Sequence, residues 1–204
     1  MGVRLQLELR GVSCLPLEEA PAAKRETCVS RSFSRPISEL EDLRQAVASY
    51  VVRAAEKLRR QRQRAGRLTV FARTSPFAPN FFSRAAGVEL PLASHDTAVL
   101  LQAALQLVPA LHRPHRRFVK AGVLLQDLQP ETQLQQHLLA PLPPEQQQRR
   151  EALMACIDGL NRRYGTGTVQ WAACGLQPDW AMRRQQLSRA ATTRLDDLPT
   201  VWAR

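Results

Sequence analysis

The sequence predicts an α+β fold in which two helices cover one face of a four-stranded antiparallel sheet. Four segments alternate apolar with polar residues, as half-buried strands do, and two longer segments repeat apolar residues at helical spacing. Their order along the chain is strand, helix, strand, strand, helix, strand, which is a split β-α-β arrangement with both helices on one side. One face of the sheet is therefore expected to stay open.

The first strand is predicted from Thr27 to Arg35, and the first long helix begins near Ser38. Ser38 and Glu41 have the spacing of a capping box, in which two side chains satisfy free backbone amides at a helix start. Apolar residues then form one helix face: Leu40, Leu43, Val47, Tyr50, Val51, Ala54 and Leu58. This face is expected to pack on the sheet.

The second and third strands are predicted at residues 67–75 (RLTVFARTS) and 85–92 (AAGVELPL). A second helix follows from Asp96 to Val108, and Pro109 should end or kink it because proline lacks the backbone donor. The fourth strand is expected at residues 118–128 (FVKAGVLLQDL), where apolar and polar residues again alternate.

The open face of this sheet is predicted to collect positive charge. Its expected members are Arg31 and Phe33 or their neighbours, Arg73 and Lys120, with Arg116 and Arg117 at the start of the last strand. Guanidinium and ammonium groups neutralise phosphates whatever the base sequence, so such a face can hold a DNA backbone. A solvated sheet surface with no ligand is the alternative.

Composition supports a polyanionic partner. The chain of 204 residues has 29 Lys and Arg against 18 Asp and Glu, a formal net charge of +11, which makes nucleic acid the leading candidate. No apolar run approaches the roughly 18 residues of a membrane-spanning helix, so we expect a cytoplasmic protein. The cysteines (Cys14, Cys28, Cys156 and Cys174) lack C-x-x-C spacing, and we expect neither a metal nor another cofactor.

Several long segments occur in a fixed order along the chain: ELRGVSCLPLEEAPAAKRETCVSRSFSRPI, RQAVASYVVRAAEKLR, TSPFAP, KAGVLLQDL, a W-x-M-R-R-x-x-L-S run and TTRLDDLP. Together they resemble the C-terminal half of the UmuC-type subunits of bacterial DNA polymerase V, a Y-family translesion polymerase. The resemblance implies four parts: the end of a thumb and a linker (1–23), a little-finger DNA-binding domain (24–128), a flexible linker (129–144) and a small C-terminal domain (145–204).

The resemblance also implies which residues face DNA, because VSRSFSRPI matches the first DNA-facing strand of the little finger. The implied DNA-binding residues are Arg31, Ser32, Phe33, Ser34, Arg73, Thr74, Arg117 and Lys120. Ser34 stands where the family usually has glycine, so a hydroxymethyl group replaces a hydrogen. In the family, the acids that hold Mg²⁺ precede the matched segments. The resemblance therefore implies a non-catalytic fragment acting in DNA repair and the SOS response.

Duplex DNA is the main partner that the resemblance implies, and a sliding clamp, RecA and a UmuD-like subunit are further candidates. The linker contains QQHLL, a degenerate version of the family's clamp-binding peptide, in which Gln135, Leu138 and Leu139 are the expected contacts. An unoccupied linker is the alternative.

The tail is expected to fold separately. Glu145 to Arg163 has the apolar pattern of a helix that ends before Gly165, and Thr168 to Ala173 is a possible strand. Trp171 and Trp180 are expected in the core of this small domain rather than stacked on bases.

Two functional alternatives stay open at this point. The chain could complete a DNA polymerase in trans with a separate catalytic half. It could also be a basic RNA-binding module, since this strand and helix order also suits RNA. However, Phe33 and Phe71 do not fall in the R-G-F-x-F run of the usual RNA-recognition sheet.

Overall fold

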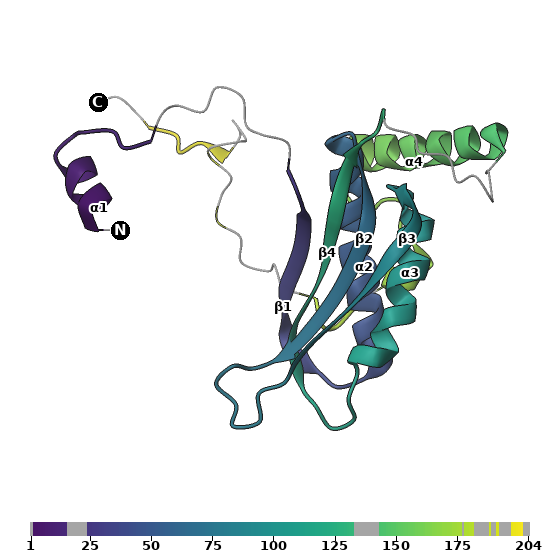
Figure 1. Ribbon diagram of the computed structural model, residues 1–204, viewed down its shortest axis with the longest axis horizontal. Coiled ribbons are helices and arrows are strands. Elements are labelled where there is room, and N and C mark those ends of the chain that lie inside the picture. The colour runs from purple at the N-terminus through teal and green to yellow at the C-terminus, as the bar shows by residue number, and fades with distance from the viewer. Residues whose placement is uncertain are drawn as a thin grey trace.

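The computed structural model describes residues 2–15, 24–132, 143–176, 178–181, 188, 191 and 197–201. Its elements are α1 (Gly2–Leu9), β1 (Thr27–Ile37), α2 (Leu40–Arg60), β2 (Gln63–Thr74), β3 (Ser83–Ser94), α3 (Thr97–Leu111), β4 (Phe118–Pro130), α4 (Pro144–Tyr164) and the short 3₁₀ helix η1 (Ala172–Cys174). The strands form one antiparallel sheet in the order β1-β4-β2-β3. The predicted α+β fold, with α2 and α3 on one face of the sheet, is confirmed (Figure 1).

The core lies between this sheet face and the two helices. From β4, the strand between β1 and β2, Ala121, Val123 and Leu125 are buried. The predicted apolar face of α2 is confirmed, apart from Leu40, which is only partly buried. Burial of this continuous apolar layer, at about 25 cal/mol per Å² of apolar surface removed from water, is the main stabilisation of the fold.

Three local predictions differ from the structure at element ends. β2 begins at Gln63, because Arg62 adopts a positive φ of 52° and reverses the chain directly after α2. The Ser38–Glu41 capping box does not form, since Glu39 is the N-cap and no side chain caps the helix. Helix α3 passes through Pro109 to Leu111. A proline in the last turn removes only one backbone bond there, and the C-cap bond from His112 N–H to the Val108 carbonyl (3.1 Å) is made.

The described part of the tail, which the sequence predicts to fold separately, packs against the sheet domain. Trp180 is 5% exposed and belongs to the core of the sheet, with its ring centroid 6.0 Å from that of Phe33 and 6.3 Å from that of Tyr50 on α2. The Ser34 N–H donates to the Trp180 carbonyl (3.1 Å), so the tail runs along the outer edge of β1. A turn and η1 stand where the strand over residues 168–173 was expected.

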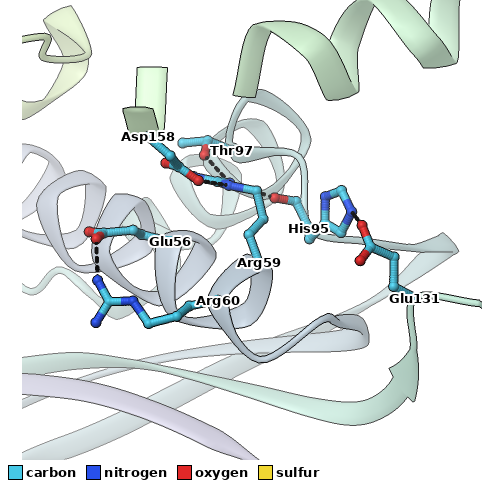
Figure 2. A network of polar contacts seen from close by, with 7 residues as sticks. All are labelled: Glu56, Arg59, Arg60, His95, Thr97, Glu131 and Asp158. Carbon is cyan, nitrogen blue, oxygen red and sulfur yellow. Dashed lines mark hydrogen bonds and ion pairs between the residues drawn. The ribbon is translucent and has the colours of Figure 1, made fainter. Parts of the chain in front are cut away.

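Helix α4 confirms the predicted helix and stop, with Gly165 at its C-cap, and ion pairs hold it against the ends of α2 and α3. The Arg59 guanidinium donates to both carboxylate oxygens of Asp158, from Nε at 2.7 Å and from Nη2 at 2.8 Å. Its Nη1 donates to the His95 carbonyl and the Thr97 hydroxyl (Figure 2). A charge-assisted, bidentate pair of this kind is strong, so Arg59 has a structural role.

His95 lies next to this network and is itself buried. Its Nε2 lies 3.1 Å from a carboxylate oxygen of Glu131 (Figure 2). Burial and the nearby Arg64 charge lower the pKa of His95, whereas the hydrogen bond to Glu131 raises it. The net effect is a lowered pKa, which favours the neutral imidazole in the folded protein.

We expect Arg59→Ala to lower the free energy of unfolding by about 3 kcal/mol, because it leaves the largely buried Asp158 carboxylate without its partner. The matched control is Arg60→Ala. Arg60 follows in the same helix but is exposed, and among the described residues its only ion pair is with Glu56 one turn away. Its loss should therefore cost less than about 0.5 kcal/mol. Urea unfolding measures both values, and equal losses would contradict the structural role of Arg59.

Candidate nucleic-acid interface

The open face of the sheet is organised in rows, because residues paired across neighbouring strands point to the same side. The row nearest the β2–β3 and α3–β4 loops consists of Ser32, Lys120, Arg73 and Ser83, one from each strand. We call it the cation row. The next two rows are uncharged and consist of Ser30, Gly122, Phe71 and Ala85, then Cys28, Leu124, Thr69 and Gly87.

The cation row brings two like charges together on the central strands. Lys120 on β4 pairs directly with Arg73 on β2, and like charges in this position destabilise a sheet. Neither side chain forms an ion pair within the described part of the chain. The Arg73 Nε is also buried without a hydrogen-bond partner among these residues, which adds a desolvation cost. The described residues thus leave this charge uncompensated.

The far end of the open face differs, because its charge is balanced. There Arg67 on β2 pairs across the strands with Glu89 on β3, and an opposite-charge pair of this kind stabilises a sheet. The Thr69 hydroxyl donates to the side-chain carbonyl of Gln126 nearby (3.2 Å). Within the described ranges, the cations that have no acid opposite them across the strands therefore lie at the loop end of the face.

Directly beside the cation row, Gly122 allows the Phe71 ring to lie across β4. A Cβ atom at Gly122 would lie only 2.4 Å from Cζ of Phe71 and 2.5 Å from Cβ of Ser30. Only glycine fits there without displacing its neighbours, and the ring in turn covers the glycine backbone. Sequence reasoning missed Gly122, although a glycine inside a strand pattern is a signal of such a close approach.

Of the predicted first-strand residues, the structure places the neighbours, not Arg31 and Phe33 themselves, on the open face. Arg31 pairs with Ala121, which is buried beneath the helices, so Arg31 lies on the helix side. Its charge accordingly acts on Tyr50 of α2: burial raises the pKa of Tyr50 to about 12, and Arg31 opposes this rise. Phe33 is half-buried against Trp180. The open-face residues of β1 are Ser30 and Ser32.

The remaining predicted site residues lie in three different settings. The hydroxyl of Ser34 donates to the Asp179 carbonyl (3.2 Å), so the tail already occupies it. Thr74 is buried, and its Oγ1 accepts a hydrogen bond from the Phe82 N–H (2.8 Å), so this side chain shapes the loop and does not reach the open face. Arg117 is exposed in the loop before β4.

The expected clamp-binding residues Gln135, Leu138 and Leu139 lie outside the described residues, as does most of the W-x-M-R-R-x-x-L-S run. Within the described ranges, no three His, Cys, Asp or Glu side chains are grouped so that they could hold a metal ion. None of the helices there is long and apolar enough to span a membrane.

These features define a class of domain: an antiparallel sheet that has two helices on one face and an uncompensated cation row on the other. Residues 24–138 match the family model described as the impB/mucB/samB family C-terminal domain, and the chain belongs to this family. Residues 151–201 match a second model, a domain of unknown function (DUF4113).

The most similar relatives confirm the resemblance to UmuC-type subunits. Protein ImpB of Salmonella typhimurium is 41% identical over 194 residues, and Protein UmuC of S. typhimurium is 39% identical over 193; each match covers 94% of this chain and 45% of the relative. The chain therefore spans less than half the length of these relatives. A solved complex of a beta-clamp processivity factor and the little finger domain of PolIV matches 55% of this chain and 97% of that chain, with 16% identity and a TM-score of 0.38.

We expect Gly122→Ala to lower the free energy of unfolding by about 1–3 kcal/mol, because the added methyl group overlaps the Phe71 ring and Ser30. Gly159→Ala is the matched control. Gly159 lies within α4 with nothing within 4 Å of an added Cβ, so the same substitution should stabilise by about 0.5–1 kcal/mol. The measurement is urea unfolding of both variants, and a neutral Gly122→Ala would show that Phe71 does not lie over this position.

Proposed function

We propose that this chain is a non-catalytic, DNA-binding part of a translesion DNA polymerase subunit and that its open sheet face holds the backbone of duplex DNA. The observation that supports it most is the Lys120–Arg73 pair, two adjacent cations without an acidic partner among the described residues. A phosphate between them would relieve their repulsion and accept charge-assisted hydrogen bonds from the two side-chain ends.

The composition of the cation row supports contact with phosphates rather than with bases. Its two ends are the exposed serines Ser32 and Ser83, so the row presents hydroxyl, ammonium, guanidinium and hydroxyl groups in sequence. All these groups donate to phosphate oxygens, which carry no sequence information. The row contains no Asn, Gln or acidic side chain of the kind that reads base edges. Binding should therefore tolerate any DNA sequence.

Membership of the impB/mucB/samB family and the similarity to UmuC support the polymerase part of the proposal. The non-catalytic part rests on the extent of the match, because the chain covers 45% of these relatives and its sheet matches their C-terminal domain model. Binding to a sliding clamp through Gln135, Leu138 and Leu139, and binding to RecA or a UmuD-like subunit, stay predictions.

A salt titration of binding to fluorescently labelled duplex DNA tests the proposal. The double variant Arg73→Ala/Lys120→Ala should bind weakly, and the slope of log affinity against log salt should fall by about two, one for each phosphate contact. The matched control is Arg31→Ala/Arg84→Ala. These two arginines belong to the adjacent row, on the helix side of the same sheet, so the control removes the same charge from the opposite face.

The control should retain most of the wild-type slope, and unrelated duplex sequences should give the same affinity. Equal losses in the two double variants would mean that net charge alone attracts DNA and would contradict the assigned face. A strong preference for one sequence would contradict backbone binding.

A further inference from the structure

The loop that joins β2 to β3 presents aromatic side chains to solvent at the end of the sheet that bears the cation row. Phe77 is 95% exposed and Phe81 is 52% exposed. A phenylalanine held in water forgoes the free energy of burial that its ring would otherwise supply. A single exposed apolar residue needs no explanation, but this loop exposes two large rings together at the end of the sheet that bears the cation row.

The loop is built so that Phe77 stays outside. The Phe77 N–H donates to the Ser75 hydroxyl (3.3 Å), and the Ala78 N–H donates to the Ser75 carbonyl (3.2 Å). Pro76 lies within this turn and Pro79 follows it, and each proline fixes its own φ angle. The turn therefore restricts the backbone conformations that would let the Phe77 ring pack on the sheet.

A second loop, between α3 and β4, is tied to the first at the same end of the sheet (Figure 1). Nη1 of Arg116 donates to the Asn80 carbonyl (2.8 Å), and the guanidinium lies 5.8 Å from the centroid of the Phe82 ring. Phe82 packs edge-on against the buried Phe118 at 6.2 Å. The two loops thus form one fixed platform next to the cation row.

The charge of this platform has one sign. Residues 75–82 and 112–117 contain no acidic residue, and the second loop adds the exposed Arg113 and Arg117. Neither arginine forms an ion pair within the described ranges. An exposed aromatic ring at the same end of the sheet as these cations is complementary to a ligand with flat apolar groups on an anionic backbone. That ligand is a nucleic-acid strand whose bases are unpaired.

We propose, on the basis of the proposed function, that this platform binds the single strand that continues beyond the duplex held by the cation row. An unpaired base stacks on the Phe77 ring, and Arg113 and Arg117 contact the adjoining phosphates. Because every base has an aromatic face, this contact is independent of sequence. The chain would then distinguish a duplex with a single-stranded extension from a blunt duplex.

The test compares two labelled probes in the full chain, a blunt duplex and the same duplex with a single-stranded extension that contains 2-aminopurine. Phe77→Ala should bind the extended duplex roughly 5- to 100-fold more weakly than wild type, the loss expected for one stacked base, and should bind the blunt duplex equally well. Phe77→Tyr keeps an aromatic face and should bind the extended duplex like wild type. Stacking should quench 2-aminopurine fluorescence in wild type and in Phe77→Tyr but not in Phe77→Ala.

Unchanged binding of both probes by Phe77→Ala would overturn this inference and would assign the exposed ring to another partner, such as a protein. Equal loss on both probes would also overturn it, since the ring would then serve the duplex itself. In both cases, salt-dependent binding of the wild-type chain to the blunt duplex would still support the proposed function. A wild-type chain that binds neither probe would contradict the proposed function together with this inference.

Discussion

The packing of α2 and α3 on one face of the sheet determines the position of every strand side chain. Strand residues alternate between faces, so burial of Ala121 and Val123 under the helices forces Lys120 and Gly122 to the opposite side. The same constraint acts through the register on β2, where Ala72 is buried and Arg73 is open. The cation row is thus a consequence of the hydrophobic core, and a shift of one residue would exchange the two faces.

The arginines of this basic chain divide into structural and unpaired groups. Arg59, Arg64 and Arg35 pair with Asp158, Glu151 and Asp179, acids that lie in α4 or in the tail. These contacts attach the C-terminal part to the sheet domain, together with the burial of Trp180. The cations of the cation row have no such partner within the described ranges. Only part of the positive charge of the chain, the part without an acidic partner in these ranges, is therefore available to attract a polyanion.

The sequence predicts the faces of β2 and β4 because one parity near Val70 and Val123 is wholly apolar, whereas the other parity includes the polar and charged residues. The first strand is different, since Ser30, Arg31 and Ser32 are polar on both parities, and only its pairing with β4 decides which side each residue takes. The contact of Trp180 with Phe33 joins segments far apart in the chain, and no local pattern indicates it. Sequence reasoning therefore succeeds where burial makes the pattern one-sided and fails where a long-range contact decides.

The central claim is that the cation row binds an anionic ligand. Urea unfolding of Lys120→Gln with and without duplex DNA tests it most directly. Removal of one of two like charges should leave the free chain as stable as wild type or more stable, by up to about 1 kcal/mol. Duplex DNA that binds only the folded state stabilises it according to its affinity, so saturating DNA should stabilise the variant clearly less than wild type. A variant that is less stable without DNA, and that gains as much from DNA as wild type does, would contradict the account.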